Sequence, residues 1–354
     1  MTHSNADFLA QFRDALTERE RAVLAKRELY RNKHIETEWE SELRRKFDTL
    51  MRATLTRQMS CGEPLANARH EARCLFVTGE AGAGKTTCLN RLLNTHPVFQ
   101  SRGEQRSPLL RVSVQAPCTL KSLGRAVLKG LGFPLAREKP DHLIWAQILD
   151  ILPTSGVLVI HFDEMHNLTD NANIAQMDNI RKTFKTLMVS PWPVGLIVSG
   201  LPSLVPEMRR IDEIRRRGQF VSVPLLSLPD DNSMVSDIIG GLAEVAGITV
   251  EAGVANHIAP RLIHGALYRF GMAIEFVHEA IELALLDEKP LSTEHFATAY
   301  ADRTGCGARM NPFVSPGWAE LDCTLVLADD PPLDTDAPVA LQRRGRKSRK
   351  GERT

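Results

Sequence analysis

The sequence of 354 residues predicts an α/β fold, with a parallel sheet between helices and further all-helical segments on either side. Three observations support this prediction. Short apolar runs, typical of buried strands, alternate with longer segments whose apolar residues recur at helical spacing. A glycine-rich loop follows the first apolar run. Two adjacent acidic residues end a later one.

The first predicted strand leads directly into the glycine-rich loop and a helix. The apolar run 74–77 precedes a segment that fits the phosphate-loop pattern G-x-x-x-x-G-K-[ST]. Glycines allow backbone N–H groups to turn toward a phosphate, and the positive end of the next helix faces the same anion. Lys85 would contact the β- and γ-phosphates of ATP, and the Thr86 hydroxyl would bind Mg²⁺. The predicted nucleotide-binding residues are Gly79, Glu80, Ala81, Gly82, Ala83, Gly84, Lys85, Thr86 and Thr87.

Two other interpretations of the loop are weaker. A glycine-rich turn with a chance lysine does not explain why a strand precedes the loop and a helix follows it. A dinucleotide-binding loop requires a third glycine, and Thr87 occupies that position.

Composition places the chain among ordinary globular proteins. Apolar residues make up 43% and charged residues 25%, and the length favours two domains. The net charge of +1 gives no general attraction to nucleic acid or membrane, so any basic surface must be local. The six cysteines have no C-x-x-C spacing, and no apolar stretch approaches 18 residues. We therefore expect a soluble, cytoplasmic protein with reduced thiols and no membrane partner.

The N-terminal segment predicts a helical extension at 1–59. Residues 6–58 contain neither proline nor glycine, and apolar residues recur at steps of three and four. Basic and acidic residues alternate, which favours a solvated face over a nucleic-acid arm. Cys61-Gly-Glu-Pro64 interrupts the pattern, so we place the αβα core at 60–228.

A second strand at 109–114 is followed by a predicted helix at 120–131. Lys121, Arg125 and Lys129 lie at i, i+4 and i+8 of this helix and therefore share one face. Such a stripe usually only solubilises a helix. DNA binding through the same three cations is the alternative hypothesis.

The apolar run 157–162 follows a turn signal at Pro153–Gly156 and ends in Asp163-Glu164. In phosphate-loop ATPases an acid at this position holds the water shell of Mg²⁺, and a following glutamate activates the attacking water. Asp163 would take the first role and Glu164 the second. His161 interrupts the run, and we expect a hydrogen-bonded core histidine there.

Two further strands and an arginine cluster complete the predicted core. A helix is predicted at 179–189. The buried run 194–200 ends near Ser199, where a γ-phosphate-sensing group would lie, although a simple turn explains this serine equally well. Before a last strand at 220–224 come five arginines, at 209, 210, 215, 216 and 217. In oligomeric ATPases this place supplies an arginine finger to the neighbouring subunit.

The C-terminal part predicts a small helical lid and a tail. Helix starts at Pro229-Asp-Asp and Ser292-Thr-Glu-His, with helical periodicity between them, predict a lid at 229–305. The rest is rich in acidic residues and proline and then basic at 343–350, so we predict a disordered tail at 306–354.

This order of features resembles the AAA+ ATPases, whose fold is a P-loop NTPase core with a helical lid. Within them, the segment Asp163-Glu-Met-His-Asn-Leu168 resembles the D-E-x-H-N-L segment of the TniB/TnsC family of transposition regulators. Gly200-Leu-Pro and the exit at 225–228 are compatible with that family. The resemblance covers roughly residues 60–300. It implies a protein that binds and hydrolyses ATP, forms a homo-oligomeric ring or filament on duplex DNA, and directs a transposase.

The resemblance also implies roles for particular residues. Lys85, Glu164 and Ser199 would act in catalysis, with Arg216 as the finger, although Arg215 and Arg217 are close alternatives. The lid departs from the family pattern because Met272 follows Gly271, and Arg269 is the substitute for the second sensor. Another AAA+ ATPase, similar to a replication initiator or associated with secretion, which has no role in transposition and binds no target DNA, remains an alternative function. A scaffold that does not hydrolyse ATP is disfavoured because Lys85 and Glu164 are both present.

Overall fold

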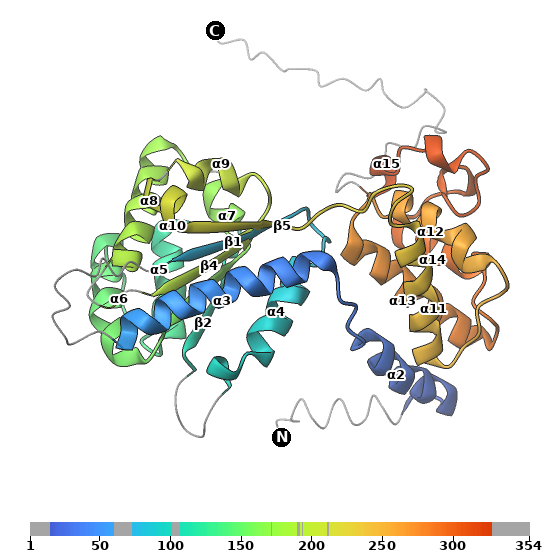
Figure 1. Cartoon of the computed structure of the whole chain (residues 1–354), viewed down its shortest axis with the longest axis horizontal. Coiled ribbons are helices and arrows are strands. Elements are labelled where there is room, and N and C mark those ends of the chain that lie inside the picture. The colour runs from blue at the N-terminus through green and yellow to red at the C-terminus, as the bar shows by residue number, and fades with distance from the viewer. Residues whose placement is uncertain are drawn as a thin grey trace, which may run out of the picture.

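The computed structural model describes residues 15–59, 73–100, 107–170, 172–189, 192, 194–210 and 212–327, and Figure 1 shows its arrangement. Five parallel strands form one sheet in the order β2-β3-β4-β1-β5. The strands are β1 (Cys74–Thr78), β2 (Leu109–Ser113), β3 (Val159–Asp163), β4 (Gly195–Gly200) and β5 (Gly218–Ser222). All five lie within about two residues of the predicted runs, which confirms the parallel α/β core.

Helices cover both faces of the sheet because its central strands are apolar on both sides. Alternate residues of β1 show this: Leu75 and Val77 pack on one face, and Cys74 and Phe76 on the other. The first face is covered by α3 (Glu38–Met59), α4 (Lys85–Thr95) and the short helix η1 (Pro97–Phe99). The other is covered by α5 (Leu120–Gly130), α6 (Asp141–Ser155), α7 (His166–Thr169), α8 (Ile174–Val189), α9 (Leu204–Arg209) and α10 (Asp212–Arg217).

The lid is a separate helical bundle with its own core, drawn in colours from golden yellow to red in Figure 1. Its main helices are α11 (Asn232–Ala246), α12 (Val254–Gly265), α13 (Phe270–Asp287) and α14 (Thr293–Thr304). The predicted helix starts are confirmed, since Asp231 precedes α11 and Ser292 forms a capping box with His295 at α14.

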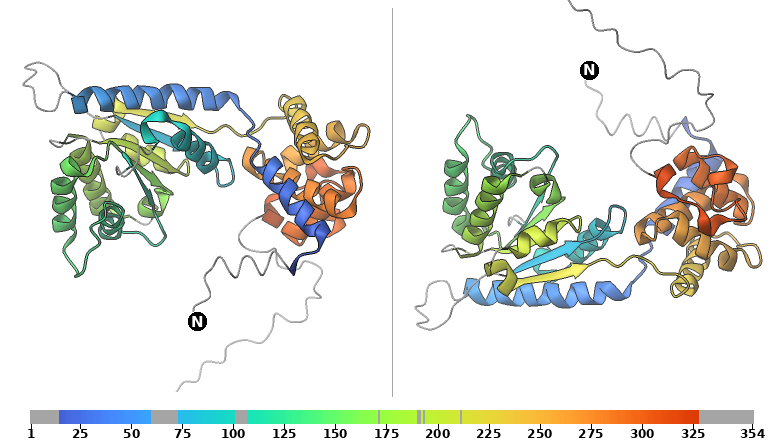
Figure 2. Two further views of the ribbon diagram at one scale, coloured as in Figure 1. Left: turned by 90° about the horizontal axis from the view of Figure 1, so that it is seen from below. Right: turned by 90° about the horizontal axis from the view of Figure 1, so that it is seen from above.

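The N-terminal extension is divided between the two parts of the molecule. Helix α2 (Glu18–Arg31) packs on α11 and α13 of the lid through Val23 and Tyr30, whereas α3 packs on the sheet. The connection at 32–37 therefore crosses from the lid to the core, as Figures 1 and 2 show. In its described part, residues 15–59, the predicted extension is mainly helical, but it does not form one unit.

Two sequence expectations are wrong. Residues 306–327 are not a disordered tail: η2 (Ala308–Met310), η3 (Trp318–Glu320) and α15 (Thr324–Leu327) continue the lid, and Phe313 is buried in its core. The predicted turn at Pro153 is the last turn of α6, which ends at Gly156 in the left-handed conformation. The remaining tail at 328–354 and the segment 1–14 lie outside the described residues.

Candidate functional site

The phosphate loop links β1 to α4 at the edge where the parallel strands end. Gly82 and Gly84 have φ angles of 73° and 94°, a region that favours glycine and allows the loop to turn tightly. The Lys85 side chain is buried and donates hydrogen bonds of 2.8 Å to the carbonyl oxygens of Gly79 and Glu80. Burial lowers the pKa of Lys85, and the carboxylates of Glu164, Asp163 and Glu80 partly oppose that shift.

Asp163 lies at the end of β3, beside the phosphate loop. The Thr86 hydroxyl lies 3.4 Å from its Oδ2. Its Oδ1 accepts hydrogen bonds from the Ser199 hydroxyl at 2.5 Å and from the backbone N–H of Glu164 at 3.0 Å. The structure thus brings together the predicted metal residues Thr86 and Asp163, with Ser199 behind them.

Hard oxygen donors are the ligands that Mg²⁺ prefers, and the Thr86 hydroxyl and Asp163 carboxylate fit that preference. Because Mg²⁺ keeps several waters and also binds substrate phosphates, two protein oxygens are enough for such a site. Across the described ranges, no group of three or more His, Cys, Asp or Glu residues forms a metal cluster. The donor set therefore fits a magnesium ion shared with a nucleotide.

His161 is the buried core histidine that the sequence predicts. Its side chain is 2% exposed, and its Nε2 lies 2.9 Å from the Ser199 hydroxyl oxygen. Burial lowers the pKa of His161 to about 4, so the ring is neutral near pH 7. Ser199 is itself fully buried, which places it behind Asp163.

Glu164 follows β3 with a backbone φ of 58°, which is uncommon for a residue with a side chain. Such a conformation costs on the order of 1–3 kcal/mol and is often found at functional sites. Its carboxylate lines the cavity next to the phosphate loop and lies 3.4 Å from Nδ1 of His166. The turn at Glu164 therefore brings its side chain to the wall of the cavity that the phosphate loop also lines.

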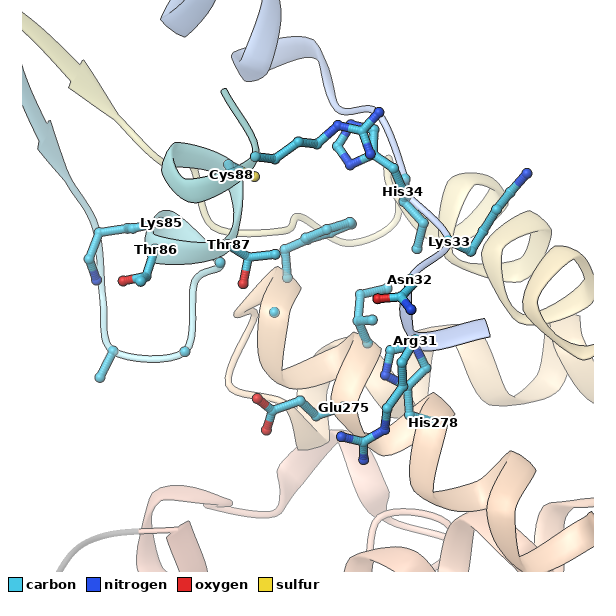
Figure 3. Close-up of a pocket in the computed structure, with 18 of the residues that line it drawn as sticks. Arg31, Asn32, Lys33, His34, Lys85, Thr86, Thr87, Cys88, Glu275 and His278 are labelled. Atoms are coloured by element: carbon cyan, nitrogen blue, oxygen red, sulfur yellow. The ribbon is translucent and has the colours of Figure 1, made fainter. Parts of the chain in front are cut away.

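A cavity of about 700 Å³ extends from the phosphate loop toward the lid, and Figure 3 shows its lining. Lys85 and Thr86 lie at one end. Arg31 at the end of α2 and residues 32–34 of the connection lie at the opposite end, with Glu275 and His278 of α13 nearby. Sequence reasoning missed this second wall. The wall comprises Arg31, Asn32, Lys33, His34, Ile35, Phe270, Gly271, Ile274, Glu275 and His278.

The lid contacts the phosphate loop directly through the start of α13. The backbone N–H of Met272 donates a 2.9 Å hydrogen bond to the Gly82 carbonyl. A Cβ at Gly271 would lie 2.5 Å from that carbonyl oxygen, so only glycine allows this approach. Arg269, directly before α13, lies 3.9 Å from the Glu80 carboxylate, which places its guanidinium beside the loop.

The arginine cluster lies away from the phosphate loop of its own chain. Residues 215–217 end α10 before β5, and Gly218 pairs with Cys74 at the opposite end of β1 from the loop. Local contacts offset much of the charge. Arg209 stacks on Phe220, Arg210 pairs with Glu207 and Arg215 pairs with Asp212, whereas Arg216 is exposed.

The cations of α5 lie on one exposed face of the helix, as the spacing predicts. Lys121 and Arg125 both contact Glu138, Lys121 at 2.6 Å, and Lys129 is exposed. The hydrogen bond from Lys121 is the main reason why the pKa of Glu138 is lowered, with the charge of Arg125 next. A carboxylate from the loop before α6 therefore partly neutralises the stripe.

Two further findings concern thiols and membranes. Cys74, Cys88, Cys118, Cys306 and Cys323 are free thiols. Within the part of the chain that the structure describes, every helix is too short or too polar to cross a membrane.

Comparison with known proteins assigns the fold. Residues 68–207 match the AAA domain family model, and no curated protein sequence matches the chain. Similar solved structures include the Aeropyrum pernix ORC1 protein in complex with DNA, with a TM-score of 0.54 and 16% identity over 76% of this chain and 66% of that chain. For Drosophila ORC bound to DNA the TM-score is 0.55 and the identity 14%, over 82% of this chain and 67% of that chain. For Cdc6p from Pyrobaculum aerophilum the TM-score is 0.50 and the identity 12%, over 77% of this chain and 69% of that chain.

The fold and the phosphate loop together define the structural class of this protein. The chain has the AAA+ P-loop NTPase fold, with a parallel five-stranded sheet among helices and a helical lid. It contains an AAA domain and is similar in structure to ORC and Cdc6 proteins. At this identity the similarity concerns the fold, and the match covers only about two thirds of those chains.

Proposed function

We propose that this protein is a Mg²⁺-dependent ATPase whose nucleotide lies between the phosphate loop and the lid. The observation that carries the proposal is the meeting of Thr86 and Asp163, at 3.4 Å, beside the buried Lys85. The oxygen atoms of Thr86 and Asp163 suit a metal ion bound to a nucleotide, and the Lys85 ammonium suits the phosphates of that nucleotide.

Each residue would have a defined task. Residues 79–87 would surround the phosphates, and Lys85 would exchange its two carbonyl partners for phosphate oxygens. Thr86 and Asp163 would hold Mg²⁺, which would neutralise charge that develops on the phosphates. Glu164 would accept a proton from the attacking water. Arg269 would contact the phosphates from the lid side.

The far end of the cavity would hold the nucleoside. Its wall combines apolar side chains of α13 with polar groups of Arg31 and of the connection that follows α2, a mixture typical of small-molecule sites. Because that connection joins a lid-bound helix to a sheet-bound helix, nucleotide binding would hold the two parts of the molecule together.

Assembly would complete the active site. Arg216 is exposed at the edge of the sheet opposite its own phosphate loop. An arginine finger placed there would reach a neighbouring subunit in a ring or filament, with Arg215 and Arg217 as alternatives.

The larger role that we propose is regulation of DNA transposition on duplex DNA. The segment Asp163–Leu168 supports it through its resemblance to TniB/TnsC proteins, and the α5 stripe offers a basic surface. An initiator-like role is the second candidate, favoured by the similarity to ORC structures solved with DNA. In both cases the chain would be an ATP-switched factor that binds DNA and other proteins.

Equilibrium binding of a fluorescent ATP analogue, with Mg²⁺ or with EDTA, tests the first part of the proposal. Wild-type protein should bind more tightly with Mg²⁺, and Lys85→Ala should lose binding in both conditions. Electron microscopy with ATP, with and without duplex DNA, tests assembly. Binding that persists unchanged in Lys85→Ala would refute the proposed site.

A further inference from the structure

His161 occupies an unusual place for a polar side chain. It lies in β3, where its neighbours in the register are Ile197 of β4 and Arg111 of β2, and the Arg111 guanidinium donates to two asparagine side chains of α4. Burial of a polar group is costly unless the group is hydrogen-bonded. The contact with Ser199 at 2.9 Å is therefore expected to determine how the imidazole is oriented.

The number of protons on Ser199 fixes the direction of this hydrogen bond. A serine hydroxyl has one proton, and here the Asp163 carboxylate lies 2.5 Å away as the stronger acceptor. The hydroxyl oxygen must then accept from His161, so the imidazole ring carries a proton on Nε2. The result is a chain of two hydrogen bonds, from His161 to Ser199 and from Ser199 to Asp163.

These two hydrogen bonds constrain one oxygen of the Asp163 carboxylate. Ser199 and the backbone N–H of Glu164 both donate to Oδ1 of Asp163. The other oxygen, Oδ2, is left to face the Thr86 hydroxyl. Partners behind a ligand carboxylate commonly orient it in this manner.

We propose that His161 is a positioning residue, which acts through Ser199 to orient Asp163 toward the Mg²⁺ of a bound nucleotide. This inference rests on the proposed nucleotide function and adds to it a residue outside the phosphate loop. It also changes the task expected of Ser199. A hydroxyl that is buried and donates to Asp163 orients the metal carboxylate, whereas a γ-phosphate sensor would have to donate to the nucleotide.

The two tasks predict different results with ATP and ADP. Orientation of a metal ligand affects both nucleotides, because both bind with Mg²⁺. Sensing of the γ-phosphate affects ATP alone. Binding measured with EDTA gives the part of the affinity that does not depend on the metal.

The experiment measures the affinities of the full chain for ATP and ADP, each with Mg²⁺ and with EDTA. His161→Met removes the donor but keeps a flexible side chain that adapts to the core. His161→Gln keeps a hydrogen-bond donor, and Ser199→Ala removes the hydroxyl that donates to Asp163. Ile197→Val is the matched control, since it removes one buried methylene beside His161 and no hydrogen-bonding group.

We expect His161→Met and Ser199→Ala to weaken binding of both nucleotides with Mg²⁺ by about tenfold to a hundredfold, the usual loss for such partners. Binding with EDTA should not change. His161→Gln should recover most of the loss, and Ile197→Val should behave as wild type. The double variant, His161→Met with Ser199→Ala, should bind nucleotide no more weakly than Ser199→Ala, because both changes interrupt the same pair of hydrogen bonds.

Three results would overturn the proposal. A loss confined to ATP would make Ser199 a γ-phosphate sensor, and an equal loss in Ile197→Val would reduce His161 to a packing residue. Unchanged binding in a folded His161→Met, with normal wild-type binding, would refute the inference alone. Absence of nucleotide binding by the wild-type chain would instead refute the proposed function, and this inference with it.

Discussion

The Thr86 hydroxyl lies 3.4 Å from Oδ2 of Asp163, although the two residues are 77 positions apart in the sequence. They meet because β1 and β3 are parallel strands of one sheet, on either side of β4, and end at the same edge. Helix α4 begins at this edge, and its first turn carries Thr86 toward the end of β3. The proposed chemistry depends on this convergence.

The contact between lid and phosphate loop predicts a strong effect of a single methyl group. In Gly271→Ala the new Cβ would lie 2.5 Å from the Gly82 carbonyl oxygen, so the start of α13 must move away. Loss of the hydrogen bond from Met272 should cost about 1 kcal/mol, or roughly fivefold in nucleotide affinity. Titration with a fluorescent nucleotide measures this change.

Gly240→Ala is the control for that experiment. Gly240 lies within α11 and has open space around its missing Cβ, so alanine should stabilise the helix by about 0.5–1 kcal/mol and leave nucleotide affinity unchanged. Equal affinities for Gly271→Ala and the wild type would show that the lid contact does not support binding.

DNA binding should depend on the α5 stripe and should be restrained by Glu138. Lys121→Ala with Arg125→Ala should weaken binding at every sequence tested and reduce the salt slope by about 0.9 for each DNA phosphate that the variant no longer neutralises. Glu138→Gln should strengthen binding a few-fold, since it frees both cations from a competing carboxylate. Fluorescence anisotropy over a range of salt concentrations measures both effects.

The basic segment at 343–350 is the competing source of DNA affinity. Deletion of residues 340–354 should leave ATP-dependent binding largely intact, because a basic tail would bind phosphates whether or not nucleotide is present. If the deletion alone abolishes binding, the α5 stripe is an ordinary solvated face.

The arginine cluster should act between subunits. Mixing Arg216→Ala subunits with Glu164→Gln subunits should restore part of the ATPase activity, because some interfaces regain both groups. Arg210→Ala is a suitable control, since Arg210 is held by Glu207 and should not be required. If both variants assemble normally and the mixture stays inactive, Arg216 does not act in trans, and Arg215 and Arg217 should be tested.

Stability should fall in mild acid, and His278 should contribute to the fall together with His161. Burial, with help from Arg31 and Arg27, lowers the pKa of His278 to about 4, whereas the unfolded value is near 6.5. The unfolded chain therefore binds a proton first, and the contribution of His278 to stability is complete above pH 6.5 and declines toward pH 4. The loss is at most about 1.4 kcal/mol per pH unit, and less for a half-buried ring.

Chemical denaturation at pH 7 and pH 5 measures this dependence. The variant His278→Leu should show a shallower decline than the wild type, because it lacks the group that titrates. The same decline in both proteins would place the acid sensitivity elsewhere.

The sequence predicted the sheet well, and also the strand and helix on either side of the glycine-rich loop, for a physical reason. Buried parallel strands need continuous apolar runs, and a phosphate loop needs glycines at fixed spacing, so both leave local patterns. The second wall of the cavity leaves no such local pattern in the sequence. Residues 31–35 reach the cavity only because α2 packs on the lid and α3 on the sheet, and this division depends on contacts between distant segments.

The errors have the same origin. Residues 306–327 lack a periodic pattern, but Phe313 packs against Phe296 and Tyr300, and Trp318 packs against His264. These aromatic contacts order a segment that the sequence prediction grouped with the acidic, proline-rich and basic residues that follow it. The link between Glu138 and the α5 stripe was equally invisible, since it depends on how the loop before α6 folds back.

Hydrolysis by Glu164→Gln tests the central claim most directly. Glutamine keeps the size of the side chain but cannot accept a proton, and Lys85, Thr86 and Asp163 remain to bind the nucleotide. We predict wild-type affinity for ATP with Mg²⁺ and a turnover reduced by roughly two to four orders of magnitude. Hydrolysis at the wild-type rate by this variant would contradict the account.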